Sequence, residues 1–264
     1  MRDSSTPVRA LEATRTTQYE TQLTKLFGKE HALWHHNWFI PVGLLACSFF
    51  RPRMKGYVIK VSHVWLEKQK AAFRARQKSK IPTSTVNSQD YVSTNDILTS
   101  WHNLINGGNV HIMALNLRSR IASFTDEMAG NYENSMIYNA PDDGHTPDAI
   151  RQSLKTFRNA SYTIPSALKT LLWNGSLSTN WSNFYKQIEL SDTITAARTT
   201  KAGRGNSQHI VHLPLMTAEE MSVWREFMCI FQLDAENKGL LIYTRTLSAQ
   251  QLEASGVGTV CYTL

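Results

Sequence analysis

Hydrophobic residues recur with two periods along this chain, and the two periods predict a mixture of strands and helices. Short runs rich in β-branched and aromatic residues predict strands. These runs cover residues 56–62, 110–117, 134–138, 186–190, 209–215, 227–233, 239–244 and 259–264. Apolar positions three and four residues apart predict helices at 8–34, 63–80, 93–106, 147–158, 164–173 and 248–254. This order favours an α/β fold, in which helices flank a mixed sheet.

The helix that begins at Ser93 has the most complete start signal in the chain. Ser93 is a favourable N-cap residue, and Asp96, three residues later, completes a capping box. Asp96 also places a negative charge in the first turn, where the helix dipole favours it. The apolar face of this helix is predicted to contain Ile97, Leu98, Trp101, Leu104 and Ile105.

Composition and charge narrow the class of protein. The 264 residues are 42% hydrophobic and 19% charged, which is typical of a globular protein and excludes a disordered one. The net charge of +7 suits an anionic partner such as a phosphorylated cofactor, and it suits a basic surface without a partner equally well. Residues 51–80 are the most basic stretch, but they carry no nucleic-acid recognition motif, so no nucleic-acid partner is expected.

Cysteine spacing and hydropathy bear on the compartment. Cys47, Cys229 and Cys261 lie far apart without a CxxC pair, which favours a reducing, cytoplasmic environment over a disulfide framework. The amino terminus lacks the apolar region of a signal peptide. The longest apolar run, residues 38–50, is too short to span a bilayer, so we expect a buried segment, with a membrane-touching segment as the alternative.

The histidines and the glycine-rich stretches do not match known catalytic or metal-binding motifs. His31 and His35 are one helical turn apart, but no glutamate stands between them as in HExxH. No metal site is therefore predicted, and an aromatic, partly buried cluster is expected instead. Residues 203–205 (Gly-Arg-Gly) are too short to form a phosphate loop, and no GxSxG elbow is present.

Four short motifs, taken in order, resemble those of one enzyme family. Residues 93–101 (STNDILTSW) resemble the helix-start motif S-x-N-D-x-L-T-x-x-W of the BAHD-type acyltransferases, which belong to the chloramphenicol-acetyltransferase-like superfamily. Residues 116–120 (NLRSR) resemble the family's D-x-R-x-R, with Asn116 in place of the acid. Residues 130–131 resemble its G-N, and residues 178–181 (STNW) resemble its T-S-W.

The resemblance covers residues 56–264 and implies the second half of such a fold, a chloramphenicol-acetyltransferase-like half-fold. Residues 1–55 would then be a remnant of the first domain or a linker. The family's catalytic motif H-x-x-x-D-G is absent, because none of the nine histidines is followed four residues later by Asp. The second hallmark, D-F-G-W-G, has at best Asp192 in place of its acid.

The resemblance also implies a reaction and a set of residue roles. An alcohol or amine would attack the thioester carbonyl of an acyl-CoA co-substrate, and no tightly bound cofactor is implied. Trp181 and Thr179 would stabilise the oxyanion of the tetrahedral intermediate. A buried aromatic residue with a satisfied N–H is an equally good interpretation of Trp181. Structural or channel-lining roles would fall to Ser93, Asn95, Asp96, Arg118, Arg120, Asn131 and Asp192.

Three hypotheses for function remain open. The first is an acyl-CoA-dependent O- or N-acyltransferase whose general-base half is missing from these residues. The second is a non-catalytic binding or dimerisation module with the same fold, and the third is a basic nucleic-acid binder. A missing half-domain would leave an apolar face uncovered, so we expect self-association or a partner that supplies the missing half.

Overall fold

The computed structural model describes residues 8–31, 53–80, 91–118, 120, 133–139, 143–158, 165, 175–182, 188–189, 209–210, 224–234 and 236–264. The main sheet consists of β1 (Lys55–Val61), β2 (Val110–Asn116), β3 (Glu133–Asn139), β4 (Gly175–Asn180), β7 (Glu226–Gln232), β8 (Lys238–Thr244) and β9 (Gly258–Thr263). A second, two-stranded sheet pairs β5 (Ile188–Glu189) with β6 (His209–Ile210). The helices are α1 (Val8–Phe27), α4 (His63–Lys80), α5 (Thr94–Ile105), α6 (Pro147–Thr156) and α9 (Ala249–Ala254).

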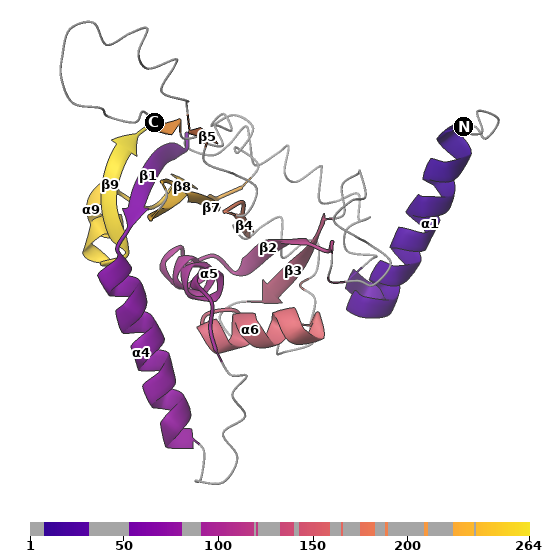
Figure 1. Cartoon of the computed structure of the whole chain (residues 1–264), viewed down its shortest axis with the longest axis horizontal. Helices are drawn as coiled ribbons and strands as arrows, with labels where there is room; N and C mark the ends of the chain where they lie inside the picture. Colours follow the sequence, from indigo (N-terminus) through magenta and orange to yellow (C-terminus); the bar gives the residue numbers. More distant parts are fainter. Residues whose placement is uncertain are drawn as a thin grey trace, which may run out of the picture.

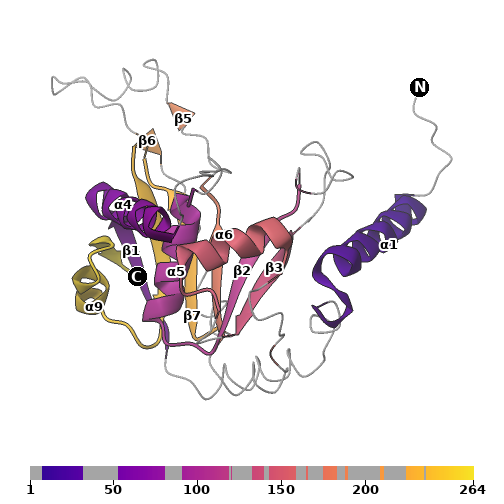
Figure 2. The same cartoon turned by 90° about the horizontal axis from the view of Figure 1, so that it is seen from below.

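The seven strands of the main sheet follow the order β3-β2-β4-β7-β8-β1-β9 (Figure 1). β4 runs parallel to both of its neighbours, β2 and β7, and every other pair in this sheet is antiparallel. Figure 2 shows α4, α5 and α6 together on one face of the sheet. The prediction of an α/β fold with a mixed sheet flanked by helices is therefore confirmed.

Strand β4 is the element that the residue pattern did not predict. Its sequence, Gly-Ser-Leu-Ser-Thr-Asn, has one large apolar residue and little intrinsic preference for a strand. It becomes a central strand because β2 and β7 pair with it on both sides, and Ser178 also donates its hydroxyl to the Ile112 carbonyl at 3.4 Å. Tertiary pairing thus overrides local propensity at the strand that carries the T-x-W-like motif.

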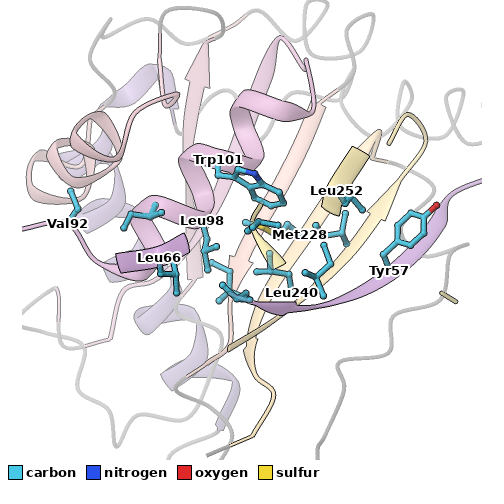
Figure 3. Close-up of a cluster of buried hydrophobic side chains, with 14 of the residues drawn as sticks. Tyr57, Leu66, Val92, Leu98, Trp101, Met228, Leu240 and Leu252 are labelled. Atoms are coloured by element: carbon cyan, nitrogen blue, oxygen red, sulfur yellow. The ribbon is translucent and has the colours of Figure 1, made fainter. Parts of the chain in front are cut away.

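The principal core lies between the sheet and the helices α4, α5 and α9. Leu98 and Trp101 of α5 pack there against Met228, Leu240 and Leu252, as Figure 3 shows. The predicted apolar face of α5 is correct for Ile97, Leu98, Trp101 and Ile105. It is wrong for Leu104, which is 63% exposed because it lies on the solvent side of the helix.

The opposite face of the sheet is also covered with buried apolar side chains. Val58, Phe227, Phe231, Leu241 and Tyr243 form a second cluster there. Trp181 lies partly buried against this cluster.

The residues predicted to be a buried apolar run, 38–50, lie outside the described residues. No helix within the described ranges is long and apolar enough to cross a membrane.

The β3 edge of the sheet is covered by the segment that contains α1. The Tyr19 hydroxyl donates to the Glu133 carbonyl, and His31 Nε2 donates to the Ser135 carbonyl at 2.8 Å. Phe27 stacks on the ring of His31 and packs against the core beside β3. These contacts occupy strand carbonyls that would otherwise face outward. The proposed division into residues 1–55 and 56–264 stays a prediction.

The other edge strand, β9, is less protected. Residues 258–264 carry no charged side chain, and Tyr262 and Leu264 are 61% and 52% exposed. The edge is partly blocked where Glu253 Oε1 accepts from the Val260 N–H at 3.0 Å. An uncharged edge strand rich in β-branched and aromatic residues favours pairing with another chain.

If the predicted self-association uses the β9 edge, Tyr262→Lys should weaken it by about tenfold, because a lysine on an edge strand opposes strand pairing. Light scattering coupled to size-exclusion chromatography over a concentration series measures this. Val64→Lys is the matched control, since Val64 is 80% exposed on α4 and lies outside the strand. An equal effect of both substitutions would indicate that added charge alone, and not the β9 edge, controls association.

Candidate active site

The start of α5 forms the predicted capping box. The Ser93 hydroxyl accepts from the Asp96 N–H at 3.3 Å, and Asp96 Oδ2 accepts from the Ser93 N–H at 2.7 Å. Both bonds satisfy backbone donors that have no partner within the helix. The capping box fixes the direction of the first turn, and with it the position of Asn95.

Asp96 is completely buried and forms an ion pair with a residue from another helix. Its Oδ2 lies 2.5 Å from a guanidinium nitrogen of Arg151 on α6, and that guanidinium also lies 4.7 Å from the ring centre of Tyr91. This partner could not be predicted from the sequence, because no motif connects α5 with α6. Asp96 thus holds the two helices together.

Arg118 and Arg120 lie just beyond the end of β2. The backbone N–H of Arg118 donates to Asn116 Oδ1 at 3.0 Å, so Asn116 stabilises the turn at this position. Arg118 is half-buried and Arg120 is exposed. The structural or channel-lining role that the resemblance implies for both arginines stays a prediction. Asn131 and Asp192, the other two residues implied by the resemblance, lie outside the described residues.

Asn95 joins the α5 motif to the β4 motif. Asn180 Nδ2 donates to Asn95 Oδ1 at 3.0 Å, although the two residues are 85 positions apart. Asn95 Nδ2 is directed at Met113 Sδ of β2 at 3.8 Å, and Asn180 Oδ1 accepts from the backbone and hydroxyl of Ser182. The first turn of α5 is thereby fixed against the middle of β2 and the carboxyl end of β4.

Thr179 and Trp181 lie at the same end of β4 but face the other side of the sheet. Side chains alternate along a strand, and Asn180 faces α5, so its two neighbours face away from α5. Trp181 packs against the cluster that contains Phe227 and Cys229, and its backbone N–H donates to the Ile230 carbonyl at 2.8 Å. The motif residues therefore converge on one strand end and are divided between its two faces.

Cys229 is the described thiol that lies next to this strand end in the sheet register. It pairs with Thr179 across β4 and β7 and is 1% exposed. Burial raises the pKa of its thiol to about 12, so the thiolate form is scarce at neutral pH. Its burial and its raised pKa are the features of a core thiol rather than of an activated nucleophile.

Three of the described histidines lie at the other end of the sheet. His111 Nδ1 is 2.7 Å from the Ser176 hydroxyl, and His111 Nε2 is 3.1 Å from His145 Nε2. His102, in α5, is completely buried. Sequence reasoning assigned His111 to a strand and His145 to a turn, and nothing in their spacing indicated that they meet. Within the described residues, no group of three His, Cys, Asp or Glu side chains could hold a metal ion.

No protein-family model and no curated protein matches this sequence. Among solved structures, TRI101 of F. graminearum in complex with ethyl coenzyme A has a TM-score of 0.39 and 12% identity, over 76% of this chain and 48% of that chain. Vinorine synthase has a TM-score of 0.38 and 15% identity, over 78% and 48%. A structure concerning the condensation domain of the enacyloxin polyketide synthase has 0.35 and 10%, over 82% and 44%. This chain spans about half the length of the structures it matches.

Proposed function

We propose that the chain forms one half of an acyl-CoA-dependent acyltransferase that acts on an alcohol or amine, and that a polypeptide segment outside these residues supplies the general base. The contact between Asn95 and Asn180 carries the proposal. It brings together two motifs that resemble those of the BAHD-type enzymes, and a sequence resemblance alone does not require them to meet. The bond is between two side chains, so it depends on residue identity as well as on the backbone.

The carboxyl end of β4 is the place where the chemistry would occur. Acyl transfer from a thioester passes through a tetrahedral intermediate, whose oxyanion needs hydrogen-bond donors fixed in advance. The Thr179 hydroxyl and the Trp181 indole N–H are such donors, and both lie on one face of β4. Rigid support comes from the Trp181 N–H bond to Ile230 on one side and from Asn180 on the other.

The general-base motif H-x-x-x-D-G is the part of the resemblance that is absent from these residues. Cys229 remains a thiol, and His102, His111 and His145 lie at the opposite end of the strands. An alcohol or amine needs a positioned base to accept its proton as it attacks. A non-catalytic module that uses the same strand end for binding or dimerisation is the alternative, and it would need no base.

We expect purified residues 1–264 to transfer no acyl group from acetyl-CoA or longer acyl-CoAs to a panel of alcohols and amines. Loss of a positioned base reduces acyl transfer by about 10²–10⁴-fold, which places the rate near background. Release of the CoA thiol, followed by its reaction with a chromogenic disulfide, measures turnover. Turnover that disappears when one histidine is replaced by alanine would contradict the missing base.

Sequencing the transcript upstream of the Met1 codon distinguishes the enzyme hypothesis from the binding-module hypothesis. An in-frame segment with H-x-x-x-D-G, or a co-purifying chain that carries it, should confer CoA-thiol release on the complete protein. Trp181→Phe in that protein should then lower kcat with little change in KM, since the indole N–H would act in the transition state. An in-frame stop codon with no companion chain would overturn the proposal and leave the binding module.

A further inference from the structure

Five buried polar residues form a row across the sheet, at the end opposite to the candidate active site. The register places Tyr138, His111, Ser176, Glu226 and Thr244 side by side on β3, β2, β4, β7 and β8. Each of them is at most 1% exposed. Burying polar side chains costs free energy unless they are hydrogen-bonded. A change of protonation that removes one of these hydrogen bonds therefore destabilises the closed structure.

His145 connects this row to the surface of the molecule. Its ring meets His111 Nε2, whose other nitrogen meets the Ser176 hydroxyl, and His145 itself is partly exposed. It belongs to residues 143–146, which lead into α6. Asn103 Nδ2 holds this loop at the Gly144 carbonyl at 3.0 Å, and Gly144, with a φ of +75°, lies so close to the Tyr138 ring that a Cβ there would clash.

The hydrogen bond between the two imidazole rings can form in only some of their protonation states. When both are neutral, one Nε2 donates and the other accepts. When His145 is charged, its Nε2 donates, His111 Nε2 accepts, and His111 Nδ1–H donates to Ser176. When both rings are charged, two N–H groups and two positive charges face each other at 3.1 Å, and the bond is lost.

We propose that His111 and His145 form a pH-sensitive latch that fastens residues 143–146 and the start of α6 to the sheet. The latch stays closed while the pair carries at most one positive charge, and it opens when both rings are protonated. Burial, assisted by the nearby rings of His145 and His102, lowers the pKa of His111 to about 3. In the open state the ring meets water and regains an ordinary affinity for protons, so acid favours opening.

Several other titratable groups surround the latch. His102 of α5 lies close enough to influence His111, and Asp143 precedes Gly144 in the same loop. Glu226 of β7 lies next to Ser176, and burial raises the pKa of its carboxyl group. Tyr138 of β3 stays protonated throughout, since burial raises its pKa. In the described structure the two ring nitrogens of His111 contact Ser176 and His145 rather than any of these groups.

The latch connects to the candidate active site through α6. Thr146 caps this helix, and Arg151, in its second turn, holds the buried Asp96 at the start of α5. Opening at the Thr146 end would therefore loosen the ion pair that supports the α5 motif. The latch itself rests on hydrogen bonds at the opposite end of the sheet and does not depend on the proposed acyl-transfer function.

Hydrogen exchange at pH 7.5 and pH 5.0, corrected for the intrinsic effect of pH, tests the latch in the full chain. If His111 binds protons with an ordinary pKa in the open state and with a pKa of about 3 in the closed state, the open population rises about 30-fold at pH 5.0. We expect this increase in the exchange of the first turns of α6. Protection of these turns that is unchanged between the two pH values would overturn the proposal.

His111→Gln identifies the group responsible, because an amide can bond to Ser176 and His145 but does not titrate. In this variant the α6 exchange should be the same at both pH values, whereas His63→Gln, at an exposed histidine on α4, should retain the 30-fold change. Retention of the full change in His111→Gln would refute the latch. If that variant does not fold, ¹⁵N spectra of the unaltered protein decide. In the singly charged pair His111 must be the Nδ1–H tautomer, and a His111 that carries its proton on Nε2 in that state would overturn the proposal.

Discussion

Arg151→Ala is expected to lower the free energy of unfolding by about 3–5 kcal/mol, as is typical when one partner of a buried ion pair is removed. Arg151 lies 2.5 Å from Asp96 Oδ2, and Asp96 is completely buried. Truncation leaves this carboxylate without its cation in a position that water does not reach. The ion pair also links α6 to α5, so we expect both helices to lose stability together in the variant. Urea unfolding at neutral pH, followed by Trp fluorescence and circular dichroism, measures the change.

Lys155→Ala provides the matched control for this substitution. Lys155 is an exposed cation one turn further along α6, and its truncation should change stability by less than about 0.5 kcal/mol. The double variant Arg151→Met with Asp96→Asn removes both charges and should recover part of the loss, because no unpaired charge is then buried. A loss below about 1 kcal/mol for Arg151→Ala would show that Asp96 is stabilised mainly by the capping box.

The elements that could be predicted from the sequence are those whose formation depends on residues close together in the chain. The capping box at Ser93 and Asp96 involves residues three apart, and its two bonds are present. Strands β2, β7 and β8 are rich in β-branched and aromatic residues, and each lies where it was predicted. The long, periodic helix α4 was predicted for the same reason. In each case the preference of the segment agrees with the fold around it.

The remaining features depend on residues that meet only in the folded chain. β4 has no strand preference of its own, so the two-sided placement of Thr179, Asn180 and Trp181 could not be derived before its neighbours were known. The partner of Asp96 comes from a helix without a recognisable motif. His111 and His145 are 34 positions apart, in a strand and a loop, and their meeting is a property of the register. A resemblance brought Asn95 and Asn180 under consideration, and the structure showed that they bond.

His102→Leu is expected to make the protein less sensitive to acid, and this is the second large effect. His102 is completely buried in α5, and neither ring nitrogen has a hydrogen-bond partner. Burial lowers the pKa of this histidine from 6.5 to about 3, so the folded protein keeps the ring neutral. The unfolded chain binds a proton at this residue as soon as the pH falls below about 6.5. The stability contributed by the neutral ring is therefore complete above pH 6.5 and is lost progressively as the pH falls toward 3.

The size of this effect follows from proton linkage. Each such histidine changes the free energy of unfolding by about 1.4 kcal/mol per pH unit within that window. Between pH 7.5 and pH 5.0 the unaltered protein should therefore lose about 2 kcal/mol more stability than His102→Leu. Urea unfolding at a series of pH values at constant ionic strength measures the difference. His63→Leu, at an exposed position on α4, should show the same pH dependence as the unaltered protein.

At pH 7.5, His102→Leu should be as stable as the unaltered protein or more stable by up to about 2 kcal/mol. A buried polar atom without a partner costs about 1–3 kcal/mol, and an apolar side chain of similar volume removes that penalty. Most substitutions at a completely buried position destabilise, so this expectation separates an unsatisfied imidazole from an ordinary core residue. A loss of more than about 1 kcal/mol at pH 7.5, together with an unchanged response to acid, would contradict it. His102 would then have a polar partner in solution, and the acid sensitivity would arise from His111 alone.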